Sequence, residues 1–171
     1  AAAKLCIAQF TGRKPYWLYA ARIGSELLLR LGRHEEARLL FEAILKARAI
    51  PWAKLGVARA QIEAGHPTRA VATLMGLIGE DPGYADAYDV LGRAQVEMGH
   101  FAEAIETYRT ASELTPDSVV RLQKLGMMCY YMGERATAVQ VLSRAVVLGI
   151  DSKLFDYQSL VLLAFAYFDE K

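Results

Sequence analysis

The chain has 171 residues, 54% of them hydrophobic, and its 20 basic and 19 acidic residues give a formal net charge of +1. A charge this close to zero produces no field that would gather nucleic acid or an anionic membrane surface, so we expect neither as a partner. Cys6 and Cys129 are too few for a disulfide framework, and this usage indicates reducing, cytoplasmic surroundings.

Apolar residues at helical spacing recur along the chain, and turn residues separate each run from the next. In chain order they predict a helix over residues 1–12, helical hairpins over 16–48, 51–82, 85–116 and 119–149, and a last helix over 152–168. Pro51 and Pro67 are each expected as the first residue of a helix, where a missing N–H is harmless. The first segment has the spacing of the second helix of a hairpin, which suggests that the chain is a piece of a longer protein.

The predicted hairpins repeat one another at a nearly constant interval. The turn residues Gly65, Gly99 and Gly133 are spaced 34 residues apart, and Gly32 precedes Gly65 by 33. One residue is therefore missing from the first interval, and we place the loss in the loop before Pro51. A repeat of this length predicts one continuous array in which neighbouring hairpins bury each other's apolar faces.

The hairpin over 85–116 carries Gly92, Ala104, Tyr108, Ala111 and Pro116 at spacings that resemble the tetratricopeptide repeat. The departures in the other hairpins are Ser25 and Ala58 in place of the glycine, Leu77 and Ile44 in place of an alanine, and Ile150 in place of the proline. The resemblance implies an all-α fold, a right-handed superhelical solenoid of helical hairpins.

The same resemblance implies a concave groove, lined by the first helix of each hairpin, that binds a peptide or a helix of a partner protein. The residues that we expect there are Tyr19, Arg22, Glu26, Trp52, Arg59, Glu63, Asp86, Asp89, Arg93, Glu97, Gln123, Met127, Tyr130, Tyr131 and Phe155. The remaining positions of the same stripe on the first helices hold Leu29, Arg30, Leu55, Ile62, Val96 and Val120. Trp, Tyr, Arg and Met are residue types that often anchor interfaces.

A competing interpretation of this groove needs no partner. The arginines and the acidic residues alternate along it, so Glu26, Arg59, Glu63, Arg93 and Glu97 are also placed to pair with one another across adjacent repeats. In this interpretation the aromatic residues pack on neighbouring side chains. For the arginines and acidic residues of the groove we give the two interpretations equal weight, and for Tyr19 and Trp52 we favour a ligand contact. The clamp with which some tetratricopeptide domains hold a C-terminal carboxylate is not expected, because the corresponding places are Arg22, Glu26, Gly56, Asp86 and Val90.

The last predicted helix is apolar nearly all round, whereas the terminal helices of a solenoid usually carry a polar outer face. Either a further helix or another subunit is expected to cover it. The alternative function is therefore homodimerisation through Tyr157, Leu160, Leu163, Phe165 and Phe168.

The sequence indicates no enzyme, no cofactor and no metal site. It contains no recognisable nucleophile motif and no glycine-rich loop between a strand and a helix for phosphate. His34, His66 and His100 lie near equivalent turns of different repeats, about 8–10 Å apart by helix packing, which is too far for one metal ion. We expect them to be solvated turn residues.

A narrower resemblance involves residues 45–58, with the sequence LKARAIPWAKLGVA, and residues 148–155. Both segments resemble the tetratricopeptide region that follows the receiver domain in some bacterial two-component response regulators. This resemblance implies that the chain is the output module of such a regulator.

Overall fold

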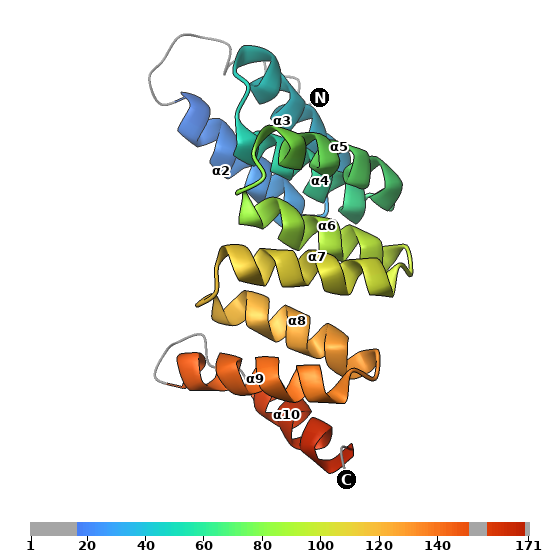
Figure 1. The fold of residues 1–171 in the computed structure, drawn as a ribbon. Coiled ribbons are helices and arrows are strands. Elements are labelled where there is room, and N and C mark those ends of the chain that lie inside the picture. Colours follow the sequence, from blue (N-terminus) through green and yellow to red (C-terminus); the bar gives the residue numbers. More distant parts are fainter. Residues whose placement is uncertain (1–16, 151–156, 170–171) are drawn as a thin grey trace. The chain divides into compact units, whose positions relative to one another are not determined.

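The computed structural model describes residues 17–150 and 157–169. Within these ranges every regular element is an α-helix, in agreement with the expected all-α fold (Figure 1). The expected helix over 1–12, together with Cys6 and Phe155, lies outside the described residues. None of the described helices is long and apolar enough to cross a membrane.

The chain divides into two compact units, Ala1–Pro82 and Gly83–Lys171. The described helices of unit 1 are α2 (Trp17–Arg30), α3 (His34–Ala47), α4 (Pro51–Glu63) and α5 (Pro67–Glu80). Those of unit 2 are α6 (Ala85–Glu97), α7 (Phe101–Leu114), α8 (Val119–Tyr131), α9 (Arg135–Gly149) and α10 (Tyr157–Asp169). These bounds agree closely with the expected hairpins, whereas the continuous array and its right-handed superhelix stay predictions.

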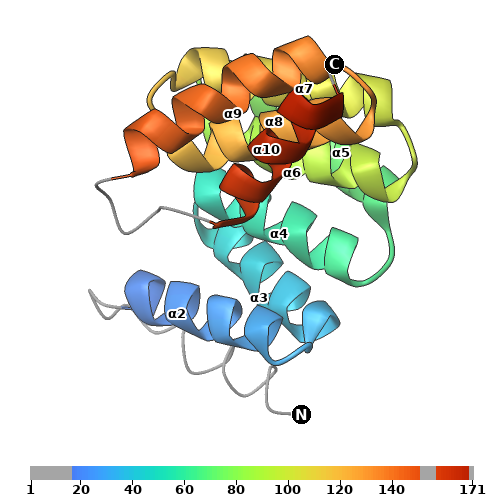
Figure 2. The same ribbon diagram turned by 90° about the horizontal axis from the view of Figure 1, so that it is seen from below.

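Each unit is built by packing helices that follow one another in the chain. In unit 1, α3 packs against α2 and α4, and α4 packs against α5. In unit 2, α6 to α9 pack in sequence, and α10 closes the series against α9 and α8 (Figure 2). Pro51 and Pro67 begin their helices, as expected.

All four described hairpins use the same turn between their two helices. Each turn contains a glycine with positive φ, a conformation that costs other residues about 1–2 kcal/mol: Gly32 (70°), Gly65 (78°), Gly99 (78°) and Gly133 (83°). The residue after each glycine donates its N–H to the carbonyl five residues earlier, at 2.8–2.9 Å, which is the bond of a Schellman motif. The interval of 33 or 34 residues seen in the sequence is therefore the spacing between successive turns of this kind.

Small residues in the first helices allow large side chains to pack very close to the backbone. A Cβ added at Gly92 of α6 would lie 2.7 Å from the Tyr108 ring of α7, and one added at Gly126 of α8 would lie 2.6 Å from Leu142 of α9. In unit 1 the Phe41 ring occupies the space that a side chain at Gly56 would need. Ser25 and Ala58, which replace the glycine in the first two repeats, are fully buried.

The contact between Gly56 and Phe41 predicts that Gly56→Ala destabilises the protein. Alanine gains about 1 kcal/mol over glycine in a helix, but overpacking a core site costs about 1–3 kcal/mol, so we expect a net loss of about 1–2 kcal/mol. Gly76→Ala in α5 is the matched control, since no atom lies within 4 Å of its added Cβ. Urea denaturation should show a gain for Gly76→Ala and a loss for Gly56→Ala; equal midpoints would contradict this packing.

Candidate partner-binding surfaces

In unit 1, the first helices of two neighbouring hairpins are joined by an ion pair. Arg59 Nη1 of α4 lies 3.0 Å from Glu26 Oε1 of α2, and both side chains are more than one-third exposed. This pair is one of those that the competing interpretation of the groove allowed between adjacent repeats. Because the pair is exposed, its net contribution to stability is small.

Trp52 also has partners within its own unit. Its ring meets the buried Phe41 ring edge-on, at a centroid distance of 6.4 Å, and the guanidinium carbon of Arg22 lies 5.2 Å from the Trp52 ring centroid. Trp52 packs against the core cluster of this unit and is only partly exposed. Trp52 therefore has a packing role within unit 1, which is the alternative to the ligand contact favoured from the sequence, and its contact with a partner stays a prediction.

The remaining expected groove positions of unit 1 divide by exposure. Tyr19 is 70% exposed, and Arg22 and Glu63 are exposed as well. Leu29 and Ile62 are buried, because the twelfth position of each first helix turns toward the core rather than toward a partner. Tyr19 thus remains the most accessible aromatic side chain of this face.

In unit 2, a cluster of charges links α6 to α8. Arg121 Nε donates to Asp89 at 2.8 Å, its Nη1 donates to Thr115 Oγ1 at 2.8 Å, and its Nη2 donates to Asp86. Lys124 Nζ lies 3.1 Å from the other Asp89 oxygen. Asp86 and Asp89 were expected to face a partner, but Arg121 joins both of them within the unit.

Sequence reasoning missed Arg121 because it is the third residue of the hairpin that begins at Val119, and this position is not among those expected to line the groove. The available signal was the pair of carboxylates, Asp86 and Asp89, one turn apart on α6. Two like charges on the same helix face are stabilised by a cation on the neighbouring helix, and Arg121 and Lys124 are the basic residues at that level of α8.

A shallow hollow of about 170 Å³ lies on the same side of unit 2, beyond the charge cluster. It brings together three of the expected groove residues, Arg93 of α6 with Met127 and Tyr131 of α8. Its other lining residues are Val96, Tyr108, Lys124 and Met128. Tyr131 is 66% exposed at its edge.

Tyr108 forms part of this hollow while most of its side chain is buried. Burial, and then the negative charge of Asp89, raise the pKa of Tyr108 to about 12, although the positive charge of Arg93 acts in the opposite direction. The phenol is therefore protonated at neutral pH, and the hollow presents no anion at this position.

The other expected groove residues of unit 2 lie around this hollow. Tyr130 is half-buried: it contacts the Tyr131 ring at 5.6 Å, and the Arg135 guanidinium lies 4.5 Å from its centroid. Gln123 is half-buried and Glu97 is exposed. The structure thus favours Arg93, Met127 and Tyr131 as accessible partner contacts and gives Tyr130 a packing role.

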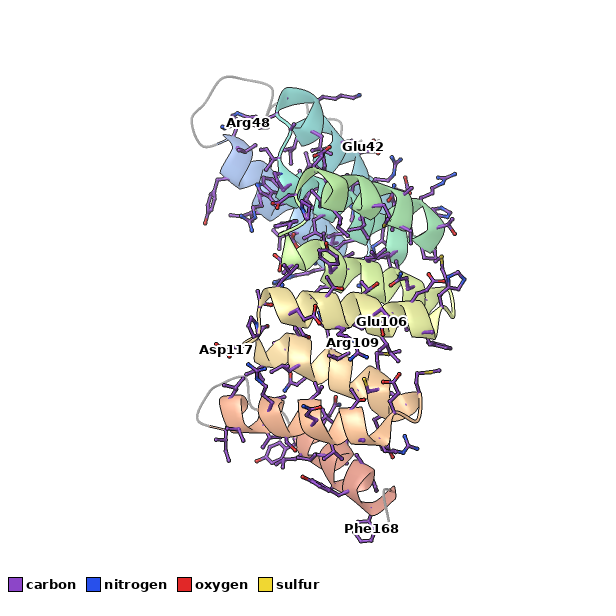
Figure 3. The ribbon with its side chains drawn as sticks, in the orientation of Figure 1. Glu42, Arg48, Glu106, Arg109, Asp117 and Phe168 are labelled. Carbon is purple, nitrogen blue, oxygen red and sulfur yellow. The ribbon has the colours of Figure 1, made fainter. Side chains whose placement is uncertain are left out.

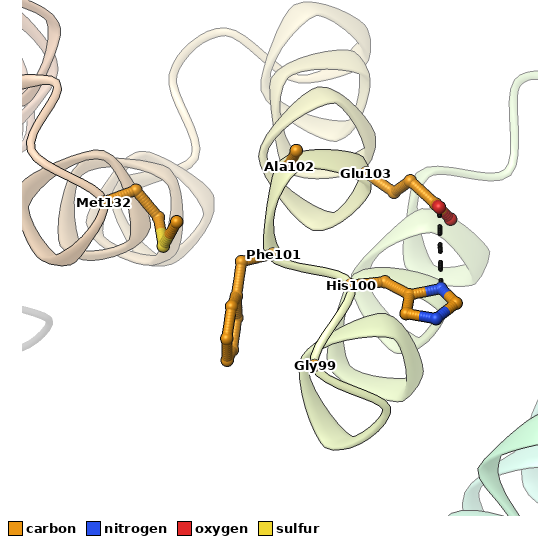
Figure 4. Close-up of a pocket in the computed structure, with 6 residues that line it drawn as sticks. All are labelled: Gly99, His100, Phe101, Ala102, Glu103 and Met132. Atoms are coloured by element: carbon orange, nitrogen blue, oxygen red, sulfur yellow. Dashed lines mark ion pairs between the residues drawn. The ribbon is translucent and has the colours of Figure 1, made fainter.

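Two further hollows lie away from this side. One, of about 280 Å³, lies beside the α6–α7 turn, where Phe101 and Met132 line it and His100 Nδ1 lies 3.5 Å from Glu103 (Figure 4). The other, of about 320 Å³, is lined by α7, α8 and α9 and includes Arg109, whose Nη2 lies 3.5 Å from Glu106 (Figure 3).

The described part of the chain contains no group of three or more His, Cys, Asp or Glu residues able to hold a metal ion. His66 and His100 precede the first residues of α5 and α7, and His34 begins α3. Cys129 is fully buried, and burial raises the pKa of its thiol to about 11, so this thiol is not an available nucleophile at neutral pH.

Helix α10 carries the apolar face expected to support self-association. Leu162 and Ala166 are buried in the core cluster of unit 2, and Leu163 packs partly against it. The exposed apolar side chains are Tyr157, Leu160, Val161, Phe165, Tyr167 and Phe168. Phe168 is 82% exposed near the end of the helix (Figure 3). The expected contact residue Leu163 is thus mainly a packing residue, and Val161 and Tyr167 extend the exposed face instead.

The charge cluster predicts that Arg121→Gln destabilises the protein. The Arg121 and Asp89 side chains are only 13% and 15% exposed, so loss of the guanidinium leaves a largely desolvated carboxylate with Lys124 alone. We expect a loss of about 2 kcal/mol, measured by urea denaturation. Arg144→Gln removes a 53%-exposed partner of Asp117 and should cost less than about 0.5 kcal/mol. Equal effects of the two substitutions would contradict a structural role for the cluster.

Comparisons with known families and structures agree with the fold of repeated helical hairpins. Residues 62–126 match the tetratricopeptide repeat model. The match runs from the end of α4 through α5, α6 and α7 into α8. Together with the repeated hairpin fold, it supports a tetratricopeptide-repeat (TPR) protein. No curated protein matches the sequence.

Known TPR structures share the fold of the chain. A thermophilic TPR protein of Thermus thermophilus is 24% identical, with a TM-score of 0.71 over 90% of this chain and 82% of that one. MamA from Desulfovibrio magneticus RS-1 is 17% identical, with a TM-score of 0.72 over 90% and 85%. YrrB, described as a TPR protein with an unusual peptide-binding site, is 18% identical, with a TM-score of 0.62 over 80% and 71%.

Proposed function

We propose that the chain is a non-catalytic module that binds a peptide or an exposed segment of a partner protein. The proposed site is the hollow of unit 2 that α6, α7 and α8 line. The observation that carries the proposal is the convergence of Arg93, Met127 and Tyr131 there, three residue types enriched at interfaces. The peptide-binding site described for YrrB supports the proposal by similarity of fold.

The size and lining of the hollow suit a single side chain of a bound peptide rather than a cofactor. Pockets for drug-sized ligands occupy about 300–1,000 Å³, whereas this hollow occupies about 170 Å³. Met127 and Met128 adjust their shape easily to an apolar group. The hollow lies between packed helices, so a ligand would meet a largely preformed surface and lose less entropy on binding.

Selection of peptides from a random library against the full chain tests this function. Selected peptides should lose at least about tenfold in affinity for the double variant Met127→Ala/Tyr131→Ala, because it removes the anchor contacts of the hollow. Met75→Ala, at an exposed apolar position of α5, is the control and should leave affinity unchanged. Equal affinity for both variants would place the binding site elsewhere; circular dichroism should confirm that both are folded.

We propose homodimerisation through α10 as a second function, supported by its uncharged, exposed apolar face between Tyr157 and Phe168. A second copy presents the same neutral face, so two α10 helices are able to bury each other without desolvating a charge. Tyr157 and Phe168, at opposite ends of the helix, are the most exposed of these side chains.

Light scattering across protein concentration tests the dimer. We expect a dimer that Phe165→Glu converts to a folded monomer, because a buried charge opposes the association. Phe165 is preferable to Leu163, whose partial burial would mix loss of association with loss of folding. Met75→Glu is the control for adding a carboxylate at an exposed apolar site, and a wild-type monomer at all concentrations would exclude this function.

We further propose that the chain is the output module of a bacterial two-component response regulator, acting in the cytoplasm. The proposal is supported by the short resemblances over residues 45–58 and 148–155. In the first of these, Leu45, Ile50 and Trp52 pack against the core cluster of unit 1, so these positions also have a packing role. A receiver domain encoded directly before residue 1 in the parent gene is the expected finding, and its absence would reject the proposal.

A further inference from the structure

The charges around the hollow of unit 2 indicate which ligand it selects. This inference rests on the proposed function. The two charged side chains that line the hollow, Arg93 and Lys124, are both cations. They lie beside apolar groups from Val96, Met127 and Met128. A ligand that uses the whole hollow therefore combines an apolar side chain with negative charge.

The acidic residues of the neighbouring cluster do not cancel this preference. Asp89 accepts hydrogen bonds from Lys124 Nζ at 3.1 Å and from Arg121 Nε at 2.8 Å, through different carboxylate oxygens. Arg121 also donates to Asp86. When Lys124 turns toward a ligand, Arg121 still donates a hydrogen bond to Asp89, so the exchange leaves this largely buried carboxylate with a cationic partner.

The position of the charges along the helices sets the direction of the ligand. Lys124 lies in the middle of α8 and Tyr131 at its end, with Met127 and Met128 between them. On α6, Glu97 is exposed and does not line the hollow. Negative charge on the ligand is therefore favoured near Lys124 and opposed near Glu97.

We propose that the hollow binds a protein segment in which one apolar side chain of leucine size is flanked by Asp or Glu. The apolar side chain enters between Val96 and Met127, and a flanking carboxylate pairs with Lys124. Such a segment differs from a free C-terminal carboxylate, because its charge comes from side chains and it is recognised anywhere within a chain.

Methionine-methyl NMR on the full chain tests the proposal with a position-specific readout. Met127 and Met128 report on the hollow, and Met75 of α5 is the internal control. The probes are three short synthetic peptides: a leucine flanked by glutamates, the same leucine flanked by lysines, and an alanine flanked by glutamates. We expect the first to shift the Met127 and Met128 signals and to bind at least about tenfold more tightly than either of the others.

Charge reversal provides the second measurement. Lys124→Glu should weaken binding of the glutamate–leucine peptide at least about tenfold and strengthen binding of the lysine–leucine peptide. Arg144→Glu makes the same charge change at an exposed position of α9 that does not line this hollow, and it should alter neither affinity by more than about twofold.

The outcomes separate this inference from the function on which it rests. If the lysine–leucine peptide shifts Met127 and Met128 with equal or higher affinity, the acidic ligand is rejected while the binding site is retained. If none of the peptides, nor any library-selected peptide, shifts these signals, the proposed function itself is rejected. A shift of all methionine signals together would indicate non-specific binding and would also reject the inference.

Discussion

The structure depends on a close contact between a small residue of one helix and a large side chain of another. At Gly92 and Gly126, the backbone of a first helix approaches Tyr108 and Leu142 of the second helix so closely that a Cβ would not fit without movement. In unit 2 this approach brings the two helices of each hairpin together, whereas in unit 1 the close contact of Gly56 with Phe41 joins two neighbouring hairpins. The glycine turn recurs in both units and sets the direction of each second helix.

Regular placement of the first helices explains why their charged residues act in groups. Neighbouring first helices lie side by side, so Glu26 meets Arg59 at the equivalent position in unit 1, and Asp89 meets Arg121 and Lys124, on either side of its equivalent position, in unit 2. These pairs stabilise the arrangement of adjacent hairpins, and the less exposed pair around Asp89 contributes the larger share. Some of the charged residues on the first helices therefore hold neighbouring helices together, and fewer of them are left to contact a partner.

The proposed site adjoins the charge cluster of unit 2, and Lys124 belongs to both. Arg93 and Lys124 border a hollow whose other lining is largely apolar or aromatic, with two methionines that adapt to a bound side chain. Helix α10 presents a different kind of surface, because its exposed apolar residues are not interrupted by charge between Tyr157 and Phe168. The first surface suits selective recognition of a charged segment, and the second suits association of apolar faces.

The sequence by itself determined the helices, their turns and the repeat, because these follow from local spacing: Gly65, Gly99 and Gly133 mark the turns, and Pro51 and Pro67 begin helices. It also identified the side of each hairpin on which partner contacts were to be sought. Only the tertiary structure decided which of those residues are accessible, since that depends on neighbours distant in sequence. Trp52 packs against Phe41, and Asp86 and Asp89 are joined by Arg121, whereas Arg93, Met127 and Tyr131 meet around a hollow. Helical periodicity assigns a side chain to a face, but the packing of adjacent helices decides whether that face is open.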